Sequence, residues 1–238
     1  ITVNNLGATL SSQTVSVTDP IYDESGLIGS WHFDETNGSA LDSSGLGNHG
    51  AVNGNPIYGP TTDSISGYSI ELDGNGDYFQ VPNSGMQQPQ NTLSISLWIK
   101  LDEYPTDITS AVGWNGGANP MTFSIWNDYN SYSGLNVYLD NIDGNHQANE
   151  LGMPELNVWE HIAFTFDGTN LVVYRNGDSQ TISASGTLGT TSADFLLGFD
   201  GYWSTLDGQL DEIKMYNRTL SESEILKLYD MGTSSNYW

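Results

Sequence analysis

The chain has 238 residues, of which 37% are apolar and 11% aromatic. This is enough to build a packed core and excludes wholesale disorder. Twenty-nine Asp and Glu residues face five Lys and Arg residues, which gives a formal net charge of −24. Such a surface repels nucleic acid and anionic membranes, so we expect neither as a partner, whereas cations should be attracted. There is no cysteine, so no disulfide can form, and no apolar run approaches the ~20 residues of a membrane span.

The first 26 residues differ in composition from the rest of the chain. They are polar, rich in serine and threonine, and lack the aromatic density of the later segments. We expect residues 1–26 to be a linker or an edge segment that follows an upstream module. The folded domain should then run over residues 27–238, as one of several domains in a larger parent chain.

An acidic loop follows, with the sequence SWHFDETNGSALDSSGLGNHG over residues 30–50. It gathers the oxygen donors Asp34, Asp42 and Asn48 among glycines and serines, without a lysine or arginine to balance their charge. Oxygens of this kind bind Ca²⁺, but Asp and Asn also stabilise ordinary turns. From these residues alone, a bound cation, a sugar site, an enzyme's acids and a polar turn all remain open.

Alternation of polar and apolar residues dominates the rest of the chain. In Thr92–Leu101, for example, four apolar side chains share one face of a strand. Short runs about ten residues apart, separated by Gly, Asn and Asp turns, predict an all-β, two-sheet antiparallel β-sandwich or jelly roll. The dipeptide Asn176-Gly177 predicts a tight hairpin turn. The runs lie at Tyr68–Leu72, Tyr78–Val81, Thr92–Leu101, Thr122–Asn127, Leu135–Asp140, Trp159–Gly168, Asn170–Ile182, Ala193–Phe199 and Gln209–Tyr216.

Two more acidic segments are expected to be hairpin loops. Asp73–Asp77 (DGNGD) resembles the start of an EF-hand loop, but Ser84 stands where the bidentate Glu would be needed. Asp140–His146 (DNIDGNH) also has the composition of a hairpin loop, with a ligand site or a second metal site as the alternative.

One short helix is predicted near the C-terminus. Ser221 is a helix cap with Glu224 three residues later, and Leu220 can pack against Ile225 as a hydrophobic staple. The acidic residues of this first turn face the positive end of the helix dipole, so we give them no other role.

Taken in order, five segments identify a family. The chain resembles the laminin-G-like, concanavalin-A-like jelly-roll domains of many secreted bacterial and archaeal proteins, over roughly residues 27 to 230. The segments that carry the resemblance are GLIGSWHFDETNGSALDSSGLGNHGAVNG, YSIELDGNGDYFQVP, LSISLWIKL, WEHIAFTFDGTNLVVYRNG and LDGQLDEIKMYNRTLSESEI.

The resemblance implies a calcium site. In this family the opening loop and the closing Asp-Glu strand commonly hold one Ca²⁺, with Asp34 and Asp211 as the implied carboxylate ligands. Asp42, Asn48 and backbone carbonyls of the glycine-rich loop would complete the set. The alternative is that Asp42 and Asn48 only shape a turn. A metal here would be structural and would join the start of the domain to its end.

The related fold also occurs in laminarinases and alginate lyases, so catalysis has to be considered. Glu71-Leu72-Asp73 begins the carboxylate pattern of retaining glucanases, but Asn75 and Gly76 stand where the acid/base residue would be. The two arginines fall in turn motifs and do not form the arginine-rich strand of a lyase site. We therefore expect no enzymatic activity.

A sugar-binding module agrees better with the loops. Sugar sites need aromatic faces for stacking and planar polar groups that read hydroxyls. We expect Trp114 and Trp203 to be exposed, because Gly and Asn flank them. For Trp126 the alternative to ligand binding is a structural role in the framework of the domain. The candidate ligand-binding residues are Trp114, Asn115, Trp126, Asp128, Tyr202 and Trp203.

The sequence thus predicts a non-catalytic, calcium-containing, lectin-like carbohydrate-binding module of a secreted or cell-surface protein. A chain at −24 should prefer a neutral polysaccharide or glycan over a sulfated or uronate-rich one. The alternative is a structural or adhesive spacer module in a large surface adhesin, which would make protein contacts and show no sugar specificity.

Overall fold

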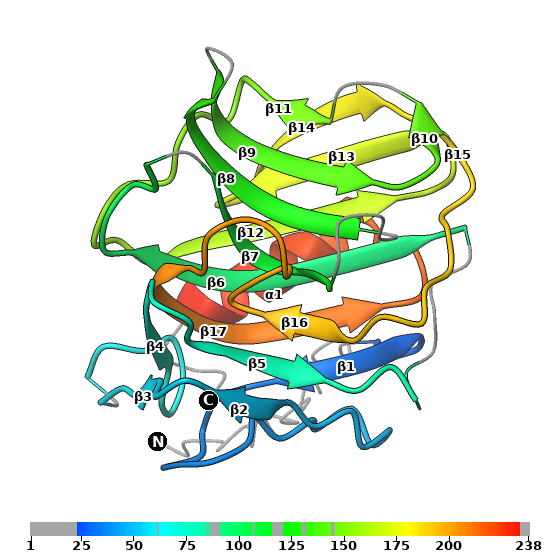
Figure 1. Cartoon of the computed structure of the whole chain (residues 1–238). Coiled ribbons are helices and arrows are strands. Elements are labelled where there is room, and N and C mark those ends of the chain that lie inside the picture. Colours follow the sequence, from blue (N-terminus) through cyan, green and yellow to red (C-terminus); the bar gives the residue numbers. More distant parts are fainter. Residues whose placement is uncertain are drawn as a thin grey trace, which may run out of the picture.

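The structure is an antiparallel β-sandwich of two large sheets with one helix (Figure 1). This computed structural model describes residues 23–233, apart from residues 61, 85, 87–90, 107, 116–120, 130–131 and 144–145. The side chains of residues 128, 129 and 143 also lie outside that description. The predicted all-β sandwich is confirmed.

One sheet has eight strands, all paired antiparallel. The predicted Asn176-Gly177 turn joins its first two strands, and both turn residues adopt the positive φ that such a turn requires (51° and 89°). In spatial order the strands are β14 (Asp178–Ser183), β13 (Asn170–Arg175), β12 (Glu160–Phe166), β6 (Leu93–Leu101), β17 (Asp207–Tyr216), β4 (Ile70–Asp73) and β3 (Ile57–Tyr58), with β1 (Leu27–Trp31) beside β17.

The second sheet has seven strands and lies in front of the first in Figure 1. A separate short pair is formed by β10 (Ile142–Asp143) and β15 (Ser185–Gly186). The seven strands, in spatial order, are β11 (Gln147–Ala148), β9 (Tyr132–Leu139), β8 (Met121–Tyr129), β7 (Ile108–Trp114), β16 (Phe195–Leu197), β5 (Tyr78–Val81) and β2 (Ala51–Asn53).

The main core fills the space between the two sheets. The four apolar side chains of β6 that were predicted to share a face all belong to it. Phe123 of β8 and Phe164 of β12 meet across the sandwich with 6.3 Å between their ring centroids. Alternation along each strand therefore places one set of side chains in the core and the other set on an outer face.

The predicted helix is present as α1 (Glu222–Thr233). One half of the expected capping box is present, because the Ser221 N–H donates to Glu224 Oε2 (2.8 Å). The Glu224 N–H donates to the Ser221 main-chain carbonyl (3.0 Å), and the Ser221 hydroxyl donates to Glu224 Oε2 (2.8 Å). Leu220 and Ile225 are buried in the same cluster, as a hydrophobic staple requires. Within the described ranges, no helix is long and apolar enough to cross a membrane.

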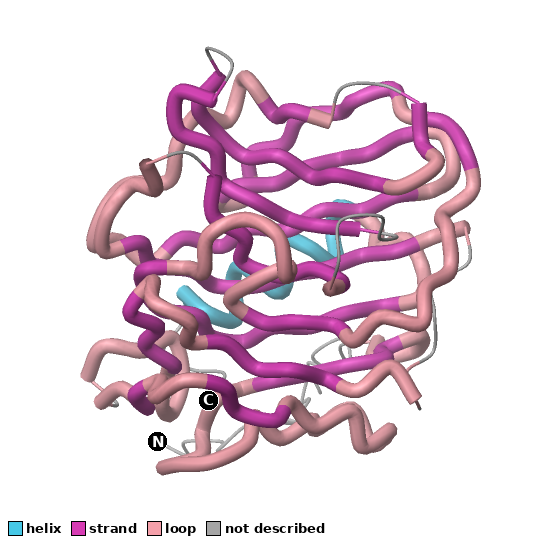
Figure 2. The backbone as a smooth tube through the Cα atoms, in the orientation of Figure 1, coloured by secondary structure: helices cyan, strands magenta, loops and turns pink. Residues whose placement is uncertain are grey.

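Helix α1 covers the outer face of the eight-stranded sheet (Figure 2). Trp98 of β6 stacks on Tyr229 of the helix at 5.9 Å, and all nine residues of β6 are buried. In the part of the chain that the structure describes, no helix covers the outer face of the seven-stranded sheet. The two outer faces of the sandwich therefore differ, because a helix covers one of them and no described helix covers the other.

Two features differ from the sequence-based expectations. Asp73–Asp77 is not a hairpin loop, because it connects β4 in one sheet to β5 in the other. The predicted strand runs also omit Ile108–Trp114, which forms β7, a central strand of the seven-stranded sheet. A bulge between Ser110 and Val112 interrupts its alternation, which explains why the period-2 pattern is weak there.

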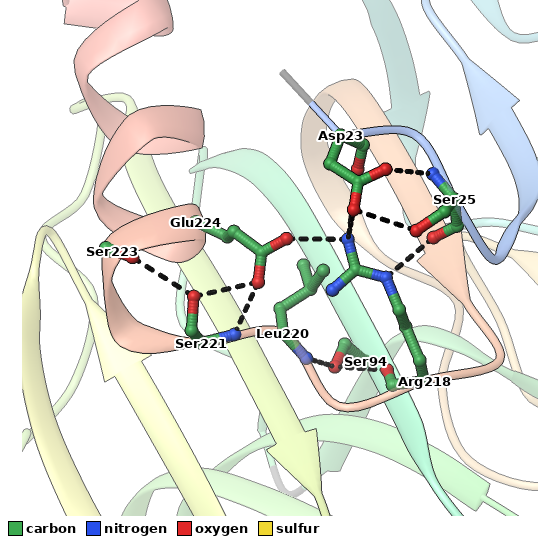
Figure 3. A network of polar contacts seen from close by, with 8 residues as sticks. All are labelled: Asp23, Ser25, Ser94, Arg218, Leu220, Ser221, Ser223 and Glu224. Carbon is green, nitrogen blue, oxygen red and sulfur yellow. Dashed lines mark hydrogen bonds and ion pairs between the residues drawn. The ribbon is translucent and has the colours of Figure 1, made fainter. Parts of the chain in front are cut away.

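Arg218 joins the start of the described chain to α1 (Figure 3). Its guanidinium donates to Glu224 Oε1 (2.6 Å) and to the main-chain carbonyls of Asp23 (3.0 Å) and Ser25 (2.6 Å). Residues 23–26 belong to the segment predicted as a linker, and Arg218 clamps them to the closing helix.

We expect Glu224→Gln to weaken this clamp in a pH-dependent way. The Arg218 hydrogen bond, against a smaller effect of desolvation, lowers the pKa of Glu224 to about 2, from an ordinary value of 4.5. A carboxyl of this kind contributes stability above its unfolded pKa and loses it as the pH falls toward the folded pKa. Because Glu224 is partly exposed, we expect Glu224→Gln to lower the free energy of unfolding at neutral pH by about 1 kcal/mol. This corresponds to roughly 2–4 °C in melting temperature.

Thermal melts of Glu224→Gln and of the control Glu222→Gln, in the same helical turn, test this. The difference in melting temperature between the two variants should become steadily smaller as the pH is lowered from 5 to 2. A gap that stays constant over that range would contradict the role of the ionised Glu224 carboxylate.

Candidate functional site

The candidate binding site lies on the outer face of the seven-stranded sheet. Trp126 of β8 follows the core residue Ile125, so alternation places it on the outer side. Asn136 and Tyr138 of the adjacent strand β9 flank the core residue Val137 and fall on the same outer face. Aromatic and amide side chains thus meet on the face that no described helix covers.

A cavity of about 360 Å³ is formed here by β8, β9 and the loop after β9. We call it the Trp126 pocket. Residues 140–146, predicted as a hairpin loop, lie between β9 and its antiparallel neighbour β11, and they include the short strand β10. The residues that line the Trp126 pocket include Trp126, Asn136, Tyr138, Asn141, Ile142 and His146.

Neighbouring side chains hold the indole of Trp126 in place. The Trp126 Nε1–H donates to the Ser124 hydroxyl at 2.8 Å, and the Tyr132 ring contacts the indole edge-on at 5.8 Å. Trp126 remains partly exposed, and Tyr138 is 47% exposed. A fixed ring beside amide groups provides a stacking surface and hydrogen-bonding groups for hydroxyls.

The predicted residues Tyr202 and Trp203 lie on a loop between β16 and β17. Oδ1 of the buried Asp200 accepts the N–H groups of Tyr202 (2.9 Å) and Trp203 (3.0 Å). Tyr202 is 67% exposed, whereas Trp203 is only partly exposed, and the two rings meet edge-on at 4.8 Å.

The prediction that Trp114 is exposed is wrong. Trp114 ends the central strand β7 and is fully buried, with its ring centroid 4.7 Å from that of Phe195 on β16. It therefore belongs to the core and is closed to stacking on a ligand. Asn115, the next residue, is exposed and donates its N–H to the Asp194 carbonyl. Asp128 lies in β8, but its side chain is outside the described part of the structure.

Asp42 holds the acidic opening loop together through backbone contacts. Its carboxylate accepts the N–H groups of Ser30, Ser44 and Asn48 (2.8–2.9 Å) and the Ser44 hydroxyl (2.7 Å). Although burial acts to raise it, these bonds hold the pKa of Asp42 below its ordinary value. Four donors fill the roughly four lone-pair positions of a carboxylate. Asn48 is buried and donates its side-chain amide to the Ile28 carbonyl. Both residues fit a loop anchor better than a calcium ligand.

Asp34 and Asp211, the other predicted calcium ligands, both bind residues 65–68. Asp211 Oδ2 accepts the N–H groups of Ile65 (2.8 Å) and Ser66 (3.2 Å), and Asp34 Oδ1 accepts the N–H of Tyr68 (2.8 Å). One carboxylate comes from β17 and the other from the chain just after β1. The structure therefore brings these two residues to one short segment.

Asp211 carries an unusual charge environment. It is fully buried, and burial together with the Glu212 carboxylate raises its pKa to about 8, against three backbone N–H bonds that act to lower it. A cation beside Asp211 would relieve this cost. Among the described residues, no three His, Asp or Glu side chains gather as a metal-binding group. A calcium site here would therefore have at most Asp34 and Asp211 as carboxylate ligands.

Comparison with known proteins decides the family. The family model described as the concanavalin A-like lectin/glucanases superfamily, of laminin G type, matches residues 73–226. The chain belongs to this superfamily. The resemblance read from the sequence motifs is confirmed.

Two similar proteins act on or bind arabinose-containing sugars. This concanavalin A-like chain is 27% identical over 232 residues to an α-L-arabinofuranosidase of Bifidobacterium longum subsp. longum. The match covers 87% of this chain and 21% of that enzyme, so the chain spans about a fifth of the relative's length. Domain 4 of an extracellular GH43 arabinanase from Geobacillus stearothermophilus, solved in complex with arabinotriose, has a TM-score of 0.69 and 22% identity, over 85% of this chain and 98% of that one.

Other solved structures share the fold at lower similarity. A sialidase of Trypanosoma rangeli has a TM-score of 0.64 at 19% identity, over 87% of this chain and 33% of that one. The receptor-binding domain of a botulinum neurotoxin C/D mosaic serotype has a TM-score of 0.61 at 15% identity, over 87% of this chain and 52% of that one. At these identities the likeness concerns the fold.

The sequence analysis of this concanavalin A-like domain missed Asn136 and Tyr138. The run Leu135–Asp140 was recognised as a strand, and its alternation already places these two residues on one face. What the run could not show is that this face has no covering helix. The nearby loop at residues 140–146 was noted only as an alternative ligand site.

We expect Asp42→Ala to destabilise the domain strongly and independently of calcium. The change leaves three backbone N–H groups of the loop without their acceptor, which costs about 3 kcal/mol, or roughly 6–12 °C in melting temperature. Asp167→Ala is the matched control, because Asp167 also accepts two backbone N–H groups but is exposed.

Melting curves with EDTA and with excess calcium complete this test. Asp42→Ala should lower the melting temperature by the same amount in EDTA and in calcium, since N–H and O–H donors already occupy the Asp42 carboxylate. A loss as small as that of Asp167→Ala, or one seen only with calcium, would contradict the anchor role.

Proposed function

We propose that this domain is a non-catalytic carbohydrate-binding module for a neutral polysaccharide, with the Trp126 pocket as its binding site. The observation that carries the proposal is the meeting of Trp126 and Tyr138 with the amides of Asn136 and Asn141 in one cavity. Ring faces stack on sugar rings, and amides donate to and accept from hydroxyls. We further propose that the module works outside the cell, as part of a larger chain.

The positions of the candidate catalytic residues support binding without catalysis. Glu71 and Asp73 lie on β4 of the eight-stranded sheet, whereas the pocket lies on the other sheet. Ser96 and His161 form a hydrogen-bonded pair at 2.7 Å, but both are buried on the face covered by α1. Burial lowers the pKa of His161 to about 3, so its imidazole is neutral. This pair is closed to substrate.

Arabinose-containing polysaccharides are the ligand class we propose first. The similar arabinanase domain was solved with arabinotriose, and the curated relative is an α-L-arabinofuranosidase. These sugars are neutral, which agrees with a domain at −24.

We expect Tyr138→Ala and Trp126→Ala to weaken glycan binding. Loss of one stacking ring should cost on the order of 1–3 kcal/mol, or roughly 5- to 150-fold in affinity. Affinity gels and calorimetry with arabinan, other neutral polysaccharides and polygalacturonate measure this. Ile57→Ala, an exposed apolar residue at the edge of the other sheet, is the matched control.

Melting curves separate binding from folding in this test. Tyr138→Ala should melt like the wild type because its ring is half exposed. Full affinity in both ring variants would place the site elsewhere. If no polysaccharide binds the wild-type domain, the structural or adhesive spacer becomes the better description.

We also propose that Asp34 and Asp211 hold one Ca²⁺, with backbone carbonyls as further ligands. The burial of Asp211 beside the Glu212 carboxylate supports this. The ion would be structural, joining the chain after β1, the segment 65–68 and β17.

Calcium should raise the melting temperature through Asp34. Free calcium at ~100 times the Kd of the site adds about 2.7 kcal/mol to the free energy of unfolding. For a domain of this size this raises the melting temperature by roughly 5–10 °C. Asp34→Ala is the better test variant, because Asp211→Ala would leave three N–H groups unsatisfied in a buried place. The difference between calcium and EDTA should vanish in Asp34→Ala and persist in the control Asp73→Ala, another exposed Asp that accepts one backbone N–H. Identical wild-type melts in EDTA and calcium would rule the site out.

A further inference from the structure

The loop between β16 and β17 presents an aromatic pair that neither the core nor the Trp126 pocket uses. Tyr202 is the most exposed large apolar side chain in the described part of the chain. Its ring meets that of Trp203 edge-on. A large exposed ring contributes little to folding, so its placement calls for another explanation.

This loop is rigidly held at both ends. Asp200 fixes the N–H groups of Tyr202 and Trp203, as described above. The Ser204 N–H donates to the Ile108 carbonyl, and the Ser110 N–H donates to the Ser204 carbonyl, both at 3.3 Å. A ring on a loop that is already ordered loses little conformational entropy when a ligand binds.

The loop rests on the same outer face as the Trp126 pocket. A Cβ added to Gly113 of β7 would lie 2.8 Å from the Asp200 Cβ and 2.9 Å from the Thr122 hydroxyl. Thr122 alternates with core residues of β8, so it lies on the outer face. Only glycine at position 113 lets the loop approach so closely.

Strand register gives the distance between the two aromatic features. Trp126 pairs with Ile108 of β7, and the next residue, Thr109, forms a bridge with Ser204. Two strand spacings of ~4.8 Å separate the backbone at Trp126 from that at Ser204, which is about 10 Å. A ligand in contact with both places must be longer than one sugar ring.

A cleft of about 230 Å³ begins directly after the aromatic pair. The hydroxyl side chains of Thr106, Ser204 and Thr205 line it together with the carboxyl groups of Glu103 and Asp207. Groups of these types are suited to hydrogen bonding with sugar hydroxyls.

We propose that the Tyr202–Trp203 loop is a second subsite for the same polysaccharide, which runs from the Trp126 pocket across β7 to Tyr202. The domain then recognises a stretch of several sugars within a chain and not a single terminal sugar. This inference rests on the proposed carbohydrate-binding function.

Calorimetry with arabinobiose, arabinotriose and arabinohexaose tests the subsite, using wild type, Tyr202→Ala, Tyr202→Phe, Trp126→Ala and the control Ile57→Ala. Wild-type affinity should rise with oligosaccharide length. Tyr202→Ala should bind the longest oligosaccharide about tenfold more weakly, which is roughly 1.4 kcal/mol of binding free energy. Its affinity for the shortest oligosaccharide that binds should equal that of the wild type. Tyr202→Phe keeps the ring and should bind like the wild type, whereas Trp126→Ala should be weaker at every length.

Two outcomes would overturn the second subsite while leaving the proposed function intact. One is a Tyr202→Ala affinity equal to that of the wild type at every length, with Trp126→Ala still weaker. The other is an equal loss for short and long oligosaccharides. Failure of the wild type to bind any of the three would contradict the arabinose assignment and this inference together.

Discussion

The packing of α1 against one side of the sandwich closes the outer face of the eight-stranded sheet. Trp98 and His161 lie on the outer face of the eight-stranded sheet and pack against Tyr229 of the helix. This contact buries both faces of β6 and closes that side of the molecule. The opposite sheet has no described helix on its outer face, and its strands alternate apolar residues with Ser124, Asn136 and Tyr138. The choice of the proposed binding face thus follows from which face the helix covers.

Backbone N–H groups are the main partners of the carboxylates that shape the loops. Asp42 and Asp200 are buried, and they accept three and two main-chain N–H groups, respectively. Charge-assisted bonds of this kind are stronger than neutral ones. They explain how a chain with five basic residues can order many acidic loops without an ion pair for each. The same arrangement fixes the exposed rings near Asp200.

The sequence predicted those features that depend on local patterns. The core face of β6, the Asn176-Gly177 turn and the contact of Glu224 with the N–H of the cap residue Ser221 each follow from a few neighbouring residues, and all three are present. Trp114 was misjudged because its Gly and Asn neighbours suggest a loop, while its burial comes from pairing with β16, which is remote in sequence. The role of Asp42 was equally hidden, since composition does not tell whether an oxygen faces a cation or an N–H group.

The acidic surface and the neutral character of the Trp126 pocket are compatible for a physical reason. Stacking on Trp126 and hydrogen bonds to Asn136 act at contact distance and carry no long-range charge term. A net charge of −24 repels polyanions before they reach the face, yet it leaves the binding of an uncharged sugar unaffected. In the proposed function, selectivity against uronates and sulfated glycans therefore comes from the charge of the whole surface. Selectivity among neutral sugars then depends on the shape of the pocket and the spacing of its rings.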